Sequence, residues 1–374
     1  MRATNNDAWL TLLGADPRPW LLQSDEPSAR WVALTELDDR AVDDPDVVEA
    51  RTKTVRDPGT IELIERLPDW ETPQRLFGHN SPAFAPNLLH LLADMGLGGG
   101  DHPAIETLLD QMLRHQIDGR FATLAVSRVT PDGAWSTLLC DHHAITEVLI
   151  RYSRTGDPRV QAALALTRDD LSPTSQGMGW PCVPEPATGF RGPGRKSDVC
   201  PQVTLEALRA FSRLPADDRP ARILAPARTI LTVWEHRGDH RPYIFGHGTR
   251  FKTIKWPPFW YGSYWVLDTL SRYPELWSGP QAELDDRRLI AELAACLIAY
   301  NVGGGGTVTP RSCYRGFDSF SFGQKKEPSP FATARVAAIL KRLNDLADQI
   351  ASVDVLTLPG SKGGTGTPVP PPQT

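Results

Sequence analysis

Apolar residues recur along most of this chain with the three-to-four-residue spacing of helices that bury one face. The pattern predicts helices over residues 85–95, 138–152, 201–211, 259–273, 284–300 and 331–343. Strand-like alternation is rare and short. Helix starts are marked by Asp-Pro pairs, because Asp caps an N-terminus and Pro fits the first helical position: Asp44-Pro45, Asp57-Pro58 and Asp157-Pro158. The chain is therefore predicted to be all-α.

The predicted helices also alternate in character. Helices with small or apolar faces start near residues 85, 138, 201, 258 and 330, and more charged helices start between them, near 103, 158, 219 and 284. Such inner–outer hairpins can stack into an open solenoid or close into a ring, an α/α toroid. Long loops rich in Gly, Pro and Trp before the inner helices favour closure around a central cavity.

The domain organisation follows from this repeat. We expect one toroid domain over residues 1–358, with a helical cap over about 1–70. A Gly/Pro-rich segment over 359–374 lacks an apolar period and is expected to be a disordered tail.

Composition narrows the class of protein. Of the 374 residues, 40% are hydrophobic and 23% are charged, which excludes wholesale disorder. The net charge of −5 argues against a nucleic-acid partner. No leader or membrane-spanning run is visible, so a cytoplasmic location is expected. Five cysteines, an odd number in a large chain, argue against a disulfide framework.

Four stretches resemble a group of bacterial proteins in the prenyltransferase and squalene-cyclase repeat superfamily. They are residues 22–55, the GAW…LLCDHHAITEVLIRY stretch at 133–152, the GWPC turn at 179–182, and FGQKKEPSPFATARVAAILKRL at 322–343. The resemblance covers most of residues 20–345 and implies the α/α toroid fold. It implies no particular reaction, because the Asp-x-Asp-Asp motif of squalene-type cyclases and the Asp-Asp-x-x-Asp motif of ionising terpene synthases are both absent.

A cysteine and histidine cluster is the first candidate site. Cys140 and His143 are three residues apart on a predicted helix, Cys182 ends the GWPC turn, and Cys200 opens the next inner helix. Cys3His is a common tetrahedral zinc set. Asp198 could support such a site from behind the ligands, and Asp198-Val199-Cys200 resembles the zinc region of the protein prenyltransferase β-subunits. The alternative is a set of buried, inert thiols.

The same helix carries candidate acid–base groups. Asp141, His142 and His143 follow Cys140 directly, and a His there could transfer protons near neutral pH. Asp141 could orient a His or serve as the acid itself if it is buried. The alternative is a structural role at the start of the helix.

A strong basic bias marks three predicted loops at 191–196, 237–255 and 311–326. They hold twelve Arg and Lys residues against Asp239 and Asp318, and the basic residues chosen as substrate-binding candidates are Arg195, Lys196, Lys252, Lys255, Lys325 and Lys326. Gathered on one face, these charges would attract an anionic group such as a diphosphate or a carboxylate. The alternative is a set of solvated loop charges.

An aromatic run could form an apolar wall. The candidates are Trp256, Trp260, Tyr261, Tyr264 and Trp265. Aromatic walls suit isoprenoid chains and stabilise cations through their π faces. The alternative is ordinary core packing.

These patterns predict a terpenoid-cyclase-like or prenyltransferase-like protein. It would hold a hydrophobic, isoprenoid-type ligand with an anionic head in an aromatic cavity, with Asp/His acid–base chemistry and zinc as its conceivable cofactor. One rival is a non-catalytic helical-repeat scaffold, which the missing cyclase motifs favour. A carbohydrate-active toroid ranks third, because no paired acids are evident in the sequence.

Overall fold

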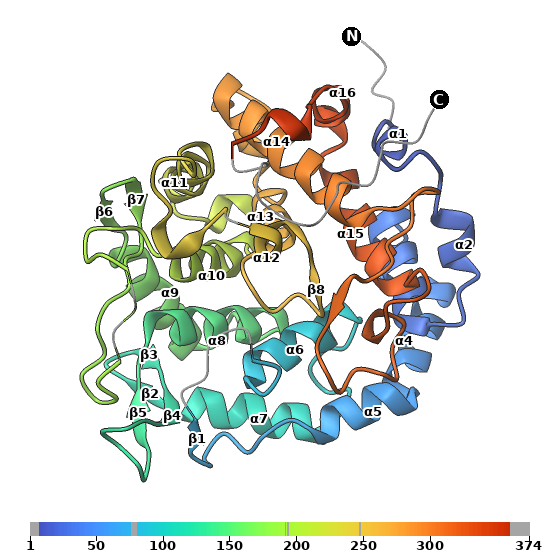
Figure 1. Cartoon of the computed structure of the whole chain (residues 1–374). Helices are drawn as coiled ribbons and strands as arrows, with labels where there is room; N and C mark the ends of the chain where they lie inside the picture. The colour runs from blue at the N-terminus through green and yellow to red at the C-terminus, as the bar shows by residue number, and fades with distance from the viewer. Residues whose placement is uncertain (1–6, 76–80, 191, 193, 247, 360–374) are drawn as a thin grey trace. The chain divides into compact units, whose positions relative to one another are not determined.

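A computed structural model describes residues 7–75, 81–190, 192, 194–246 and 248–359 (Figure 1). Helices make up 52% of the chain, which confirms the helical framework. The described residues form two compact units: one comprises 1–59, 94–96 and 234–374, and the other 60–93 and 97–233. The expected single ring over 1–358 stays a prediction, and the expected tail falls, apart from residue 359, outside the described residues.

The unit formed by residues 60–93 and 97–233, called here the middle unit, contains the first three predicted inner helices. Its helices are α6 (Ala85–Asp94), α7 (Pro103–Arg114), α8 (Leu139–Arg151), α9 (Pro158–Asp169), α10 (Pro201–Ser212) and the 3-10 turn η2 (Ala216–Asp218). The helices α5 (Pro58–Glu65) and α11 (Leu224–Glu235) cross its boundaries.

Short strands edge the loops of the middle unit. A three-stranded sheet holds β1 (Gln74–Arg75), β4 (Thr123–Val126) and β5 (Ala134–Ser136), with β1 parallel and β5 antiparallel to β4. Two antiparallel hairpins pair β2 (Gln116–Ile117) with β3 (Arg120–Phe121) and β6 (Ser172–Thr174) with β7 (Gly177–Gly179). Because no described strand exceeds four residues, none builds a sheet core.

The other unit, called here the terminal unit, contains both ends of the described chain. Its helices are α1 (Trp9–Leu13), α2 (Arg18–Leu22), α3 (Pro27–Val32), the π-helical η1 (Ala33–Leu37), α4 (Pro45–Arg56), α12 (Gly248–Lys252), α13 (Ser263–Leu270), α14 (Leu284–Asn301), α15 (Pro330–Arg342) and α16 (Ala347–Ala351). Short 3-10 turns are η3 (Pro242–Ile244), η4 (Pro274–Leu276), η5 (Ser321–Gly323), η6 (Asn344–Leu346) and η7 (Val355–Thr357). Its strands β8 (Lys255–Trp256) and β9 (Ser312–Cys313) pair in parallel.

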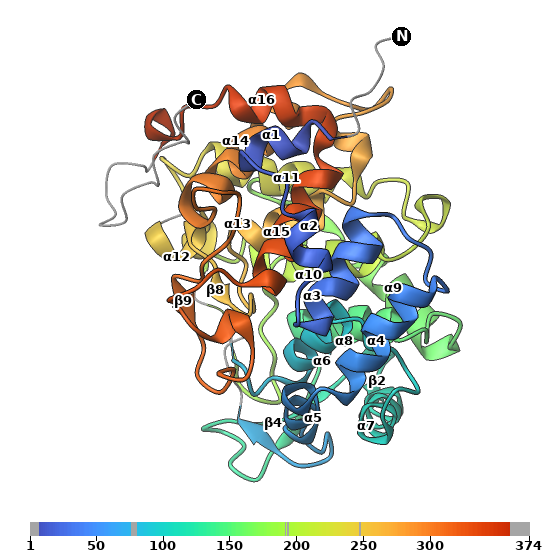
Figure 2. The same ribbon diagram turned by 90° about the vertical axis from the view of Figure 1, so that its right-hand side faces the viewer.

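Helices from the two ends of the chain pack together in the terminal unit. Figure 2 shows α15 beside α3 and α16 beside α1. The backbone N–H of Trp9 donates to Asn344 Oδ1 at 3.1 Å. None of the described helices is long and apolar enough to cross a membrane.

Capping explains where the helices begin. The Asp44 side chain accepts from the Asp46 N–H and the Asp157 side chain from the Arg159 N–H, each with Pro at the first helical position. At α7 the cap is His102, whose Nδ1 accepts from the Ala104 N–H at 3.2 Å.

The inner helices α8 and α10 pack against each other and are buried on nearly every side. Helix α6 joins α8, since the Tyr152 hydroxyl just after α8 donates to the Leu89 carbonyl oxygen at 2.8 Å. A helix without a solvent-facing side must bury its polar residues as well, and these provide the candidate chemistry.

The predicted helix over 259–273 is shorter than expected. It begins at Ser263, with Gly262 as its N-cap residue. The two prolines at 257 and 258 lack backbone donors and restrict the backbone before it, which disfavours an earlier helix start. Trp256, Trp260 and Tyr261 therefore lie before the helix, and only Tyr264 and Trp265 of the aromatic run belong to it.

Candidate active site in the middle unit

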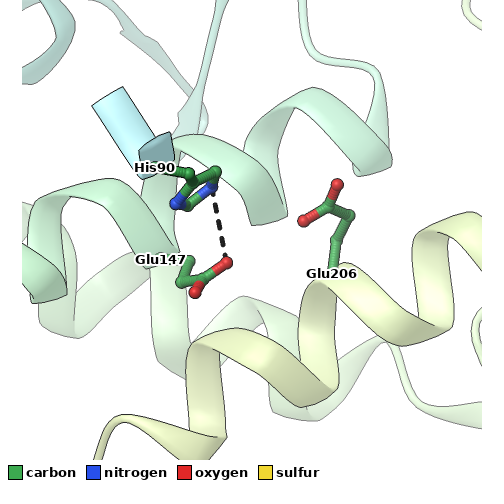
Figure 3. A group of neighbouring side chains, drawn as sticks. All are labelled: His90, Glu147 and Glu206. Atoms are coloured by element: carbon green, nitrogen blue, oxygen red, sulfur yellow. Dashed lines mark ion pairs between the residues drawn. The ribbon is translucent and has the colours of Figure 1, made fainter. Parts of the chain in front are cut away.

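Three buried polar side chains from three helices meet inside the middle unit: His90 of α6, Glu147 of α8 and Glu206 of α10 (Figure 3). One ligand-type atom from each lies within 4.8 Å of the other two. Glu147 has no solvent exposure, and the other two side chains are at most 5% exposed. In Figure 3 the three side chains point toward one another.

Glu147 is held as a carboxylate. Its Oε1 accepts from Arg213 Nε at 3.0 Å, and its Oε2 lies 3.2 Å from Arg209 Nε. His90 Nε2 is 3.4 Å from the same Oε2. Burial alone would raise the pKa of Glu147, but the guanidinium of Arg209 and its other cationic neighbours lower it well below the ordinary value.

Glu206 has the opposite character. Its Oε1 accepts from Gln202 Nε2 at 2.7 Å, whereas its Oε2 is buried and has no hydrogen-bond partner among the described residues. Burial, reinforced by the charge of Glu147, raises the pKa of Glu206 to about 8 against the opposing pull of Arg209. At neutral pH Glu206 is therefore a neutral carboxylic acid with a proton to donate.

The His/Glu/Glu group is also a possible set of metal ligands. Both oxygens of Glu147 already face arginine, and Arg209 is itself only 3% exposed. A divalent cation would have to enter beside two fixed positive charges, which repel it. The donor set thus fits an acid–base pair with its counter-charges better than it fits a metal centre.

The predicted thiols lie close together in the same unit. The side chains of Cys182 and Cys200 are hydrogen-bonded, and this bond together with burial raises the pKa of the Cys200 thiol. The pKa of Cys140 is raised by burial and by the charge of Asp141. All five cysteines of the chain are free thiols.

The fourth predicted ligand, His143, has only one ring nitrogen engaged, and its Nε2 is buried without a hydrogen-bond partner among the described residues. His143 Nδ1 donates to the Val203 carbonyl oxygen at 3.1 Å, and burial lowers the pKa of His143 to about 4. Cys140, His143, Cys182 and Cys200 are not gathered within the 4.8 Å that unites His90, Glu147 and Glu206, as far as the described residues go. Zinc at the thiols, with Asp198 behind them, stays a prediction.

The predicted catalytic residues are all buried at the start of α8. His142 uses both ring nitrogens: Nδ1 accepts from the Phe121 N–H at 3.1 Å, and Nε2 lies 3.3 Å from Thr167 Oγ1. Burial lowers the pKa of His142 well below its usual range. A catalytic role for Asp141, His142 and His143 stays a prediction, and His142 itself has the contacts of a structural residue.

Most of the predicted aromatic wall lies in the core of the terminal unit. Trp256 is 1% exposed and packs against Tyr264 and Phe322. Tyr261 and Trp265 are also buried, whereas Trp260 is 37% exposed and stacks on Tyr261.

The basic residues predicted to bind an anion differ in their solvent exposure. Lys252 is buried, with Nζ 3.5 Å from the Tyr300 hydroxyl, and Lys255 Nζ lies 3.8 Å from the centre of the Tyr314 ring. The remaining four are exposed: Arg195, Lys196, Lys325 and Lys326. Their role in binding an anionic ligand stays a prediction.

Sequence reasoning missed the Glu147–Glu206 pair. The position of each glutamate in the sequence could have revealed the pair. Each one stands among apolar residues, in AITEVLI and TLEALRAF, on a helix predicted to be internal. A charge in such a place cannot avoid burial and so requires partners.

No protein-family model matches this sequence, and no curated protein matches it. Among solved structures, the chain is similar to a ligand-free variant of the type II terpene cyclase MstE from Scytonema. The TM-score is 0.41 at 16% sequence identity, over 91% of this chain and 96% of that one.

Proposed function

We propose that this protein is an acid–base enzyme in which the carboxylic acid of Glu206 donates a proton to a hydrophobic substrate. The observation that carries the proposal is the pairing of two buried carboxyls with opposite partners. Glu147 faces two arginines, while the Oε2 of Glu206 has no hydrogen-bond partner in the described part of the chain. Paired carboxyls pushed toward opposite protonation states are typical of catalytic acid–base sites.

The roles in the proposal follow from charge. Glu206 gives its proton to the substrate and becomes a carboxylate beside Arg209, which stabilises the new charge. Burial, and then the nearby negative charge of Glu147, keep Glu206 protonated in the resting state. The isoprenoid class of substrate comes from the sequence resemblance and the aromatic run, and its anionic head comes from the basic bias of the three loops.

Isotope transfer tests this proposal. The protein would be incubated in D2O with polyprenyl alcohols and polyprenyl diphosphates, and products analysed by mass spectrometry. We expect a product carrying one solvent deuterium, and Glu206→Gln should slow its formation by roughly 10²–10⁴-fold. Asp141→Asn is the matched control and should retain activity.

Each other outcome has a clear meaning. An inactive Asp141→Asn beside an active Glu206→Gln would move the acid to Asp141, as the sequence suggested. A folded protein that turns over none of these substrates would favour the scaffold function.

One observation favours a second candidate, a carbohydrate-active enzyme. Glu147 and Glu206 form the acid pair that this function needs, with carboxylate atoms within 4.8 Å of each other. However, the arginines that bind Glu147 stabilise its negative charge, and this would make Glu147 a weaker nucleophile or base. Hydrolysis of nitrophenyl glycosides, lost in both Glu147→Gln and Glu206→Gln, would support this candidate instead.

Zinc binding is a separate proposal for the thiols of Cys140, Cys182 and Cys200, with His143 as the fourth ligand. The mutual influence of the three thiols on their pKa values supports it. Elemental analysis of protein purified without chelator should give about one zinc per chain, and Cys182→Ser/Cys200→Ser should lose it. A zinc content far below one per chain would end this proposal.

A further inference from the structure

Arg237 is a buried cation in the terminal unit whose hydrogen bonds are only partly made. It lies just after α11, and its side chain is 3% exposed. Its Nη1 donates to the Trp234 carbonyl oxygen, and its guanidinium carbon stacks 3.5 Å from the centre of the Trp234 ring. The Nε and Nη2 atoms have no hydrogen-bond acceptor among the residues described.

The two unused donors lie on one edge of the guanidinium. Nε–H and the adjacent Nη2–H point the same way, and together they match the two oxygens of a carboxylate or a phosphate. An arginine held by a ring face and one carbonyl, with this edge unpaired, has the shape of a preformed oxyanion receptor.

A second buried cation lies in the same unit. Lys252 of α12 is 5% exposed, and both Lys252 and Arg237 act on the pKa of Cys296 in α14, opposing the rise to about 11 that burial causes. The acid that acts on Arg237 is Glu292, whose carboxylate already accepts from Trp234 Nε1 at 3.2 Å and Arg288 Nη1 at 2.9 Å.

The backbone at Gly246 also packs closely against the Arg237 side chain. Gly246 has a φ of +75°, and a Cβ at this position would lie 3.0 Å from Arg237 Cδ. Burial lowers the pKa of Arg237 to about 10, so the guanidinium is still charged at neutral pH. A buried charge with so few compensating contacts is costly unless an anion completes its shell.

We propose that Arg237 forms an oxyanion-binding site that takes a phosphate or carboxylate group on the Nε/Nη2 edge of the guanidinium. The site does not depend on the acid–base role of Glu206, and it would bind an anion whether or not that chemistry occurs.

Thermal melting with defined anions tests the site. Inorganic phosphate should raise the Tm of the full-length protein by roughly 3–5 °C at a hundred times its Kd, relative to chloride at equal ionic strength. Acetate in place of phosphate distinguishes the source, because stabilisation by acetate alone identifies a carboxylate site. No stabilisation by phosphate or acetate would overturn the proposal.

Variants of Arg237 test whether this residue causes the shift in Tm. Arg237→Met should abolish the shift, and Arg237→Lys should weaken phosphate binding roughly tenfold because a single ammonium cannot replace the paired donors. Arg250→Gln removes an exposed charge from the same unit and should keep the full shift. An unchanged shift in Arg237→Met would also overturn the proposal.

The substitution itself gives a second readout. In buffer without oxyanions, Arg237→Met should melt at or above the wild-type temperature, since it removes a poorly compensated charge. If Arg237→Met fails to fold, a crystal structure of the wild type grown in phosphate would show whether an anion binds to Arg237. Density for an anion on Nε and Nη2 supports the site, and a bare guanidinium edge refutes it.

Discussion

Arg335 of α15 donates to the carboxylate of Glu36, which lies 299 residues earlier in the chain, with Nη1 and Oε1 2.7 Å apart. Arg342, two turns further along α15, binds the other oxygen of Glu36 at 2.7 Å. Glu36 lies in the π-helical segment η1, so one carboxylate links η1 near the start of the chain to α15 near its end. Asp268 completes the network by accepting from Arg342 at 2.7 Å.

Replacing Arg335 by Met should destabilise the protein by about 3–5 kcal/mol, because it takes a buried counter-charge away from Glu36 and Asp94. Urea denaturation measures this free energy of unfolding. Lys341→Met is the matched control on the same helix: its partner Asp39 is 78% exposed, so its change should stay within about 1 kcal/mol. Equal losses in both variants would contradict a special role for the buried network.

The two carboxyls of the candidate active site should give opposite pH dependences. Because the folded pKa of Glu206 is raised to about 8, the stability tied to its proton is complete below about pH 4.5 and is lost as the pH rises toward 8. Glu206→Gln mimics the protonated acid. Its free energy of unfolding should therefore rise relative to that of the wild type by a few kcal/mol across that range. Parallel unfolding curves for the two proteins at every pH would count against a raised pKa.

Glu147 should show the reverse slope. Its folded pKa is lowered, so its contribution is present above its unfolded pKa and lost as the pH falls below about 4.5. Glu147→Gln should be strongly destabilised at pH 7, and the gap to the wild type should narrow in acid. Unfolding free energies measured between pH 3 and pH 7, as rough limits, would check this. A gap that stays constant would mean that Glu147 is not held as a carboxylate.

The aromatic run can be divided experimentally into core and surface. Trp256→Ala should cost about 3–5 kcal/mol because the ring is 1% exposed and packs against Tyr264. Trp260→Ala should cost far less, since that ring is 37% exposed. Trp260 is thus the member of the predicted wall whose effect on ligand binding can be measured in a folded protein. A similar loss of Tm in both variants would show that Trp260 is also a packing residue.

Thiol labelling should follow burial. Cys182 and Cys313 are half-buried, while Cys140, Cys200 and Cys296 are buried and their pKa values are raised by their surroundings. A maleimide should modify the first two in the native protein and all five only after unfolding. Peptide mass spectrometry would show the order. Fast native labelling of Cys296 would contradict the packing of α14.

The sequence by itself determined the helical framework. Apolar periodicity located α6, α8, α10, α14 and α15 to within a residue or two, and the Asp-Pro pairs marked helix starts such as that of α9 at Pro158. These features are local, because periodicity and capping depend on residues within a few positions of one another. The helix at α13 was misjudged at its start, where prolines override the apolar pattern.

The candidate site was decided by tertiary structure. His90, Glu147 and Glu206 are far apart in the sequence, and only the packing of α6, α8 and α10 brings them within 4.8 Å. The sequence placed a titratable residue on each helix but could not show that Arg209 would hold Glu147 as a carboxylate while burial kept Glu206 neutral. Protonation state depends on burial and on neighbours across helices, and both exist only once the chain is folded.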